Sequence, residues 1–167
     1  LMAVATEEMH QLFHNISGAG YTIILTNREG VILNLVCDAG LEQNFLSANL
    51  RIGGDWGEQH AGTNGIGTTI AEDRAVTVHM NDHFLACNIN LTCTGAPIHN
   101  PMGELIAVLD ASAIPGDDNP ANQLLMRGLI TNAVRSIENQ LIMLAYHHKK
   151  IVRFHTQLEL LGLSSEA

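Results

Sequence analysis

Two pairs of apolar, β-branched segments, each joined by a short polar turn, constrain the fold of this chain most strongly. The first pair comprises residues 21–26 and 31–37, and the second comprises residues 91–98 and 105–111. A short turn can join only antiparallel neighbours, because parallel strands need a long crossover. Each pair therefore predicts a β-hairpin, and the chain must build an antiparallel sheet.

Helical patterns and one further strand complete the predicted body of the domain. Apolar residues recur at helical spacing in residues 2–17, a short helix is expected in residues 41–50, and another begins at Thr63 or Asn64, either of which can cap it. Residues 75–79 predict a short strand. The order of these elements indicates an α+β fold, with one antiparallel sheet and helices packed on it.

A long helix is expected after the proline-bounded stretch at residues 115–120, running towards residue 160. We therefore divide the chain into a body, residues 1–119, and a long C-terminal helix, residues 120–167, packed on the same domain. Its apolar side recurs in alternating steps of four and three, at Ile130, Val134, Ile137, Leu141, Leu144, His148 and Ile151. The helix could lie across its own sheet. We favour an interface with a second copy of the helix, because three heptads form a stripe longer than a small sheet can cover.

The charge distribution argues against nucleic-acid binding by these residues. Residues 1–120 hold fourteen acidic and three basic side chains, a net charge of −11. Such a body repels phosphate backbones. We therefore expect no direct contact with nucleic acid.

The cysteine content and the lack of long apolar runs indicate the cellular setting. The three cysteines cannot all pair with one another, and no apolar run approaches the ~20 residues that a membrane span requires. We expect a reducing, cytoplasmic location without membrane contact. Because the chain opens at Leu1 rather than at methionine, we also expect it to be a piece of a longer protein.

The glycine-rich residues 62–68 resemble a phosphate-binding loop only superficially. They lack the Gly-Lys-Ser/Thr ending, and no lysine precedes Lys149. A turn into a helix that packs closely on the sheet is the better interpretation. We expect no cofactor here.

Histidine and cysteine side chains between residues 79 and 93 are the remaining candidates for chemistry. His79 and His83 are four residues apart, but His79 ends a predicted strand, so the pair would not share a helical face. Cys93 lies in mid-strand, where a thiol usually packs as a small apolar group. No catalytic or metal-binding constellation emerges, and we expect no enzyme.

Three blocks of residues, in order, resemble GAF sensor domains. Residues 55–68 resemble the W-S-E-x-x-x-G-T-N-A-I-G-T block, residues 78–84 the V-x-x-x-E-H-F/Y segment and residues 91–98 the T-C-S-A-A-P-I strand. Residues 101–110 then fit D-P-x-G-x-L-x-G-V-L-D. This chain has Gly57 in place of serine, Gly65 in place of alanine, and Thr94-Gly95 in place of serine-alanine.

The resemblance is to the amino-terminal domains of sigma-54-dependent transcriptional activators of the acetoin-catabolism regulator type. It implies a small-molecule cavity between the sheet and the connecting helices, a dimer through the terminal helices, and ATPase and DNA-binding domains downstream. The expected function is sensing of a small neutral organic effector, such as a hydroxyketone, alcohol or aromatic compound. The target would be a catabolic operon.

We expect the ligand site to comprise residues of the three blocks and their flanking loops: Trp56, Asn64, Ile66, His79, His83, Phe84, Thr92 and Cys93. A neutral imidazole can donate and accept hydrogen bonds near neutral pH, which makes His83 the leading polar candidate. Alternatively, Trp56 only fills the core, Asn64 only caps its helix and His79 only faces water.

Two rival functions stay open from the sequence. Some GAF-fold proteins reduce free methionine sulfoxide through cysteines, and Cys87 with Cys93 would be the pair here. A metal or redox sensor would use the same cysteines with His79 and His83.

Overall fold

A computed structural model describes residues 1–114 and 119–152 of the chain. The strands are β1 (Tyr21–Asn27), β2 (Ile32–Val36), β3 (Val76–His79), β4 (Thr92–His99) and β5 (Leu105–Ala113). The α-helices are α1 (Met2–Ile16), α2 (Glu42–Ser47), α3 (Glu58–Ala61), α4 (Gly65–Glu72) and α5 (Pro120–Ala145). Two 3₁₀ turns, η1 (Met80–Asp82) and η2 (Ala86–Asn88), follow β3.

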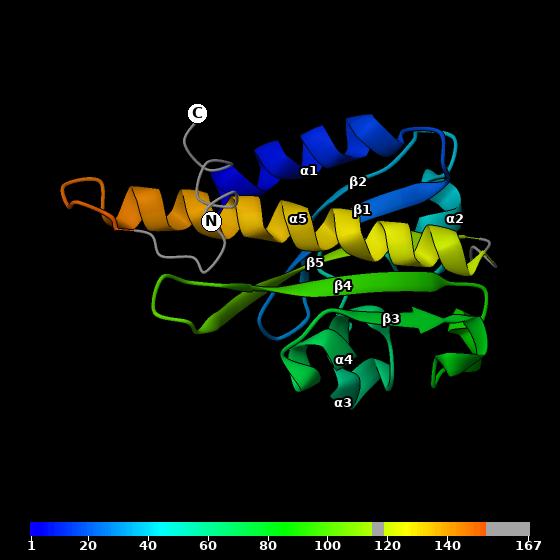
Figure 1. Cartoon of the computed structure of the whole chain (residues 1–167). Coiled ribbons are helices and arrows are strands. Elements are labelled where there is room, and N and C mark those ends of the chain that lie inside the picture. Colours follow the sequence, from blue (N-terminus) through cyan, green and yellow to red (C-terminus); the bar gives the residue numbers. More distant parts are fainter. Residues whose placement is uncertain (115–118, 153–167) are drawn as a thin grey trace.

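The five strands form one antiparallel sheet in the order β2-β1-β5-β4-β3 (Figure 1). Both predicted hairpins are present, as the pairs β1–β2 and β4–β5. The two hairpins join through the long pairing of β1 with β5, which runs from Tyr21↔Ala113 to Asn27↔Ala107. The predicted α+β fold is confirmed.

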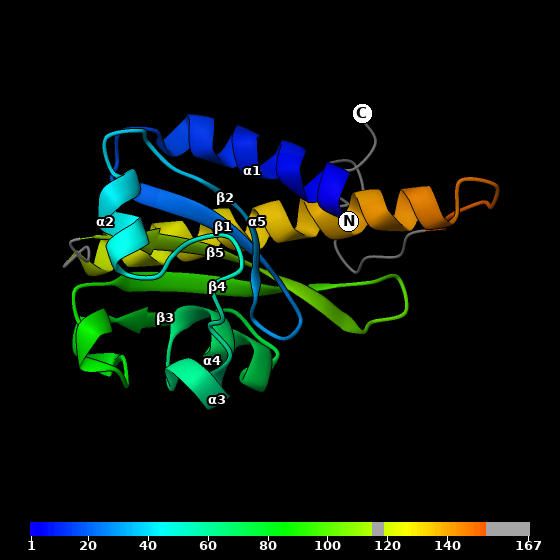
Figure 2. The same cartoon turned by 180° about the vertical axis from the view of Figure 1, so that it is seen from behind.

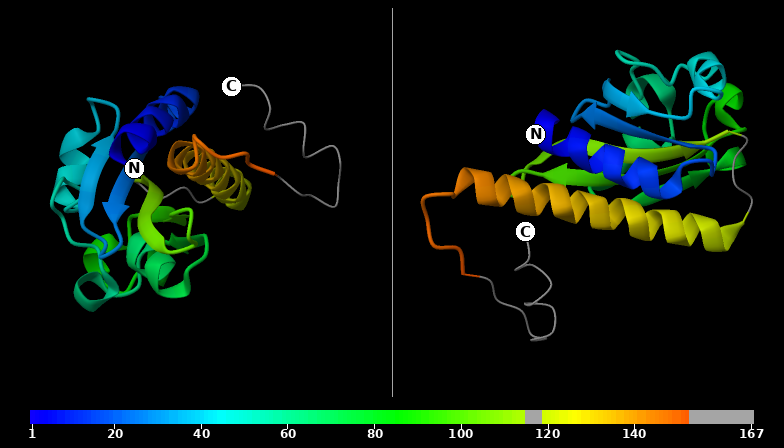
Figure 3. Two further views of the ribbon diagram at one scale, coloured as in Figure 1. Left: turned by 90° about the vertical axis from the view of Figure 1, so that its left-hand side faces the viewer. Right: turned by 90° about the horizontal axis from the view of Figure 1, so that it is seen from above.

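Helices cover both faces of the sheet. The helices α1 and α5 lie side by side and antiparallel on one face, while α2, α3 and α4 lie on the other (Figures 1, 2 and 3). Side chains alternate along β1 between the two layers: Ile23 and Leu25 pack under α1 and α5, and Ile24 packs towards α4. The sheet thus separates two apolar cores.

The long helix α5 packs on its own sheet. The prediction that its apolar side faces a second copy of the chain was therefore wrong. Ile130, Val134 and Ile137 are buried in the core under α1 and α5. Helix α5 ends at Ala145, so His148 and Ile151 lie outside it, and the predicted continuation beyond residue 152 lies outside the described residues.

Strand length explains this packing. The nine residues of β5 extend roughly 30 Å at about 3.3 Å per residue, whereas a helix rises only about 1.5 Å per residue. One long strand therefore covers more than five turns of helix.

Among the described residues, no helix is long and apolar enough to cross a membrane.

Candidate functional site

Asn64 fastens the beginning of α4 to the loop that carries Trp56. Its Oδ1 accepts hydrogen bonds from the backbone N–H groups of Ile66 and Gly67, each at 2.9 Å. Its Nδ2 donates to the carbonyl oxygens of Trp56 at 2.9 Å and Gly62 at 2.8 Å. The side chain is fully buried. Because its oxygen and its nitrogen both form hydrogen bonds within the protein, the side chain stabilises the fold. Ile66, near the start of the helix, is buried in the core beneath α4.

Trp56 fills the core on the α4 face of the sheet. Its ring is 3% exposed and packs in the same apolar cluster as Phe45, Leu50 and Ile66. The indole Nε1 donates to the carbonyl oxygen of Asn49 at 3.2 Å. The indole is therefore held firmly, and its remaining exposed edge borders a surface hollow.

His79 and Thr92 lie on the opposite face of the sheet from Trp56. The two residues are register partners in β3 and β4, and Nδ1 of His79 is 2.8 Å from Oγ1 of Thr92. The same nitrogen lies 3.2 Å from Nε2 of Gln123 in α5, which places His79 beneath that helix. Two of the predicted ligand residues are thus separated from the others by the sheet.

His83 and Phe84 lie in the loop between η1 and η2. His83 is 5% exposed, and its Nδ1 donates to the carbonyl oxygen of Met80 at 3.0 Å, which leaves Nε2 sealed without a partner among the described residues. Burial lowers the pKa of His83 more than this hydrogen bond raises it, so the imidazole is neutral at pH 7. Phe84 is 74% exposed and rests against Gly62.

Cys93 belongs to a small polar cluster sealed under α4. Oγ of Ser112 lies 3.1 Å from Sγ of Cys93 and 2.6 Å from Oδ2 of Asp110. Burial, with the nearby charge of Asp110, raises the pKa of the Cys93 thiol well above its usual range. A thiol held protonated is a poor nucleophile, because the thiolate is the reactive form.

Asp110 is fully buried beside Cys93 and Gly65. Burial raises its pKa to about 6 against the lowering effect of the hydrogen bond from Ser112. Its Oδ1 has no partner among the described residues. Gly65 leaves no room for a side chain here, because a Cβ atom would lie 2.7 Å from Oδ1 of Asp110.

The surface hollow beside Trp56 is the best candidate for a ligand site. It has a volume of 360 Å³, within the range usual for small-molecule sites. It lies between α2, α3 and η2 and is lined by Ser47, Ala48, Asn49, Asp55, Trp56, His60, Ala61, Leu85, Cys87 and Asn88. A second hollow of 280 Å³ shares Ser47, Ala48 and Cys87 with it.

Of the predicted site residues, only Trp56 lines this hollow. Sequence reasoning missed Asn88, which is 4% exposed, because it lies in an irregular segment without periodicity. The one available signal was its position shortly before β4. The sequence does not show that η2 lies beside α2, because these two segments are distant along the chain.

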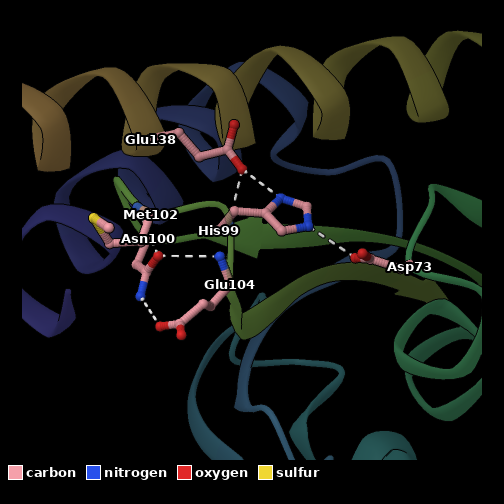
Figure 4. A network of polar contacts seen from close by, with 6 residues as sticks. All are labelled: Asp73, His99, Asn100, Met102, Glu104 and Glu138. Carbon is pink, nitrogen blue, oxygen red and sulfur yellow. Dashed lines mark hydrogen bonds and ion pairs between the residues drawn. The ribbon is translucent and has the colours of Figure 1, made fainter.

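A polar bridge joins the helices of the two faces around the end of β4 (Figure 4). Nε2 of His99 lies 2.8 Å from Oδ1 of Asp73, at the C-terminal end of α4, and Nδ1 lies 2.9 Å from Oε1 of Glu138 in α5. The backbone N–H of His99 also donates to this Oε1 at 2.8 Å. Burial lowers the pKa of His99, but the two carboxylates outweigh it and raise the pKa overall. Since both ring nitrogens face acceptors, the protonated imidazole fits the bridge best.

Metal and cysteine chemistry find little support in this geometry. Within residues 1–114 and 119–152, no group of three or more histidine, cysteine or acidic side chains could hold a metal ion. Cys87 is exposed while Cys93 is sealed under α4.

The fold and the two-faced arrangement are those of a GAF-like domain. Over 88% of the chain, the structure superposes with a TM-score of 0.81 on the crystal structure of the E. coli DhaR(N)–DhaL complex, covering 49% of that chain at 15% sequence identity. This likeness concerns the fold alone.

Residues 1–136 match the MimR N-terminal domain family, and the chain belongs to that family. It is 32% identical over 98% of its length to the acetoin catabolism regulatory protein of Cupriavidus necator. It is 27% identical over 84% of its length to the propane 2-monooxygenase operon transcriptional activator MimR of Mycolicibacterium smegmatis. The chain spans 24% and 25% of these two relatives. The first relative is named as a regulatory protein and the second as a transcriptional activator.

Proposed function

We propose that this domain is the effector-sensing module of a bacterial sigma-54-dependent transcriptional activator that controls a catabolic operon, such as one for acetoin, alcohol or aromatic use. The observation that carries the proposal is the hollow beside Trp56, which lies between α2, α3 and η2. Its size suits a small organic molecule. Two relatives support a role in catabolic regulation, since one is named for acetoin catabolism and the other for the propane 2-monooxygenase operon.

The effector is proposed to be small, neutral and organic. No lysine or arginine lines the hollow, and at its rim Nδ1 of His60 lies 2.9 Å from Oδ2 of Asp55. An anionic effector would therefore lose its hydration without gaining a cationic partner.

The output is proposed to travel through α5. His99 connects Asp73 at the end of α4 to Glu138 in α5, so a shift of α4 changes the hydrogen bonding of the long helix. An effector that favours one arrangement shifts the population towards it. In the complete regulator, ATPase and DNA-binding domains would follow, and the whole would act in the cytoplasm.

A homodimer through the terminal helices is proposed on a face of α5 different from the buried one. Leu124 and Leu125 are 74% and 62% exposed, and Met143 and Leu144 are 51% and 60% exposed. These apolar side chains lie near both ends of α5, outside its buried face, where a second copy of the helix could cover them.

A thermal-shift screen of short alcohols, diols, ketones and phenols tests the sensing function. A compound that binds the folded domain raises its melting temperature by mass action. We expect at least one neutral compound to do so and also to change transcription by the full-length regulator. Binding without any change in transcription would contradict the proposed function.

A further inference from the structure

We propose that the hollow beside Trp56 recognises an uncharged organic ligand through a single oxygen acceptor, which is bound by the side-chain amide of Asn88. This inference rests on the proposed sensing function. It adds where the ligand binds and which side chain forms a hydrogen bond with it. The geometry of Asn88 carries it.

Asn88 offers an unused donor at a buried position. Its backbone N–H donates to the carbonyl oxygen of Leu85 at 2.9 Å, and its own carbonyl oxygen accepts from Leu91 at 2.9 Å. Its Oδ1 accepts from Sγ of Cys87 at 3.5 Å. No hydrogen bond is made by Nδ2 to any residue of the described ranges, although the residue is 4% exposed.

The free amide is reachable from the hollow. In the described part of the chain, three side-chain atoms are completely buried and have no hydrogen-bond partner: Oγ1 of Thr69, Nε2 of His83 and Oδ1 of Asp110. Nδ2 of Asn88 also has no partner but is not among them, so this atom is accessible from outside the protein. Because Asn88 lines the hollow and is otherwise buried, the hollow is its route to solvent. A buried donor without a protein partner costs free energy unless water or a ligand satisfies it.

The rest of the lining defines the ligand. Trp56 and Ala61 are buried and apolar, and Ala48 and Leu85 are half-buried, so most of the inner surface suits carbon. The indole N–H of Trp56 is already donated to Asn49. The structure therefore provides one free inner donor within an apolar wall, which fits a short ketone or alcohol.

A larger hollow of 500 Å³ beside the edge strand β2 lacks this combination. Its polar lining residues His10, Glu42 and Arg51 are all exposed, so solvent competes with a ligand for their hydrogen bonds and they discriminate poorly between ligands. The hollow beside Trp56 is better suited to selective binding.

Matched ring compounds test the inference, with the fluorescence of Trp56 as the signal because it is the one tryptophan of the chain. Cyclopentanone and cyclopentane share a ring and differ in the carbonyl group. We expect cyclopentanone to bind about tenfold more tightly, and Asn88→Leu to abolish this preference. As a matched control, Asn122→Leu on the exposed side of α5 should keep it.

A measurement on the unchanged chain covers the case in which Asn88→Leu fails to fold. In ¹⁵N-labelled protein, the side-chain NH₂ signals of Asn88 should move on addition of cyclopentanone, while those of Asn122 should stay in place. Equal binding of the two rings, or unmoved Asn88 signals, would overturn the inference. Moved Asn88 signals without a transcriptional response would support this site and instead contradict the sensing function.

Discussion

Asp110 is a carboxyl group sealed inside the domain, and its surroundings make the stability of the fold depend on pH. Its pKa is raised to about 6 in the folded chain, mainly by burial, while an unfolded aspartate has a pKa of 3.8. The folded state therefore binds the proton more tightly. The carboxyl group stabilises the fold fully only below about pH 4, and this contribution is lost as the pH rises through about 6.

We expect Asp110→Asn to be more stable than the parent at pH 8 and to lose much of this pH dependence. The shift of about two units corresponds to about 3 kcal/mol of unfolding free energy. Urea unfolding at pH 5 and pH 8 measures the effect. Gln11→Ala, on the exposed side of α1, removes no titratable group; it is the control and should leave the pH profile unchanged. A parent-like pH profile in Asp110→Asn would contradict the assignment.

Gly65 and Gly95 let α4 approach β4 more closely than a methyl group would permit. A Cβ on Gly65 would lie against Cβ of Cys93, and a Cβ on Gly95 would lie 2.6 Å from the carbonyl oxygen of Gly65. We expect either glycine-to-alanine change to destabilise the fold by about 1–3 kcal/mol.

Gly128→Ala is the matched control for these two variants. Gly128 lies in α5, and a Cβ atom added there would meet nothing within 4 Å, so alanine should stabilise the helix by about 1 kcal/mol. Urea unfolding compares all three variants. Parent-like stability of Gly65→Ala would show that α4 can move away from the sheet without cost.

Residue roles were only partly predictable, because a sequence does not reveal which face of the sheet a side chain occupies. The cap at Asn64 could be expected from its position before the helix, and the structure confirms it. That His79 and Thr92 lie beneath α5, and Cys93 beneath α4, depends on the register of β3 with β4. Asn88 had no periodic pattern around it, so its place beside Trp56 could not be predicted.

At the scale of elements, His99 joins three that are distant in sequence: the end of α4, the end of β4 and the middle of α5. The two carboxylates that face it, Asp73 and Glu138, outweigh burial and raise the pKa of the imidazole. The bridge therefore stabilises the fold fully below about pH 6.5, and this contribution is lost as the pH rises through the raised value.

We expect His99→Gln to destabilise the domain more at pH 6 than at pH 9, because glutamine cannot carry the charge between two carboxylates. Chemical unfolding of both proteins at the two pH values measures this difference. Asn15→Gln, on the exposed side of α1, exchanges two side chains that do not titrate and should show the same stability change at both. An equal loss at pH 6 and pH 9 would mean that the bridge acts without its charge.

The hairpins and helices followed from turns and periodicity, whereas their pairing did not. Short connections predict β1–β2 and β4–β5, but the joining of the hairpins through β1 and β5 is a contact between distant segments. The apolar side of α5 was recognised correctly as a stripe. Its partner was assigned wrongly, because a heptad pattern looks the same against a second helix as against a sheet.

At the scale of the whole molecule, the exposed apolar side chains of α5 predict self-association. We expect the double variant Leu125→Glu, Met143→Glu to be monomeric where the parent is dimeric, since each change places an unpaired charge in the interface. Sedimentation velocity at micromolar concentration measures the state. Ile52→Glu, 67% exposed on the loop after α2, is the control and should remain dimeric. A monomeric parent would contradict the proposed dimer.

A structure of the domain with the compound that most raises its melting temperature tests the central claim most directly. The account predicts that this compound occupies the hollow between Trp56, Leu85 and Asn88, with an oxygen atom within hydrogen-bonding distance of Nδ2 of Asn88. A compound bound instead in the groove beside β2, or on the α5 face of the sheet, would contradict it.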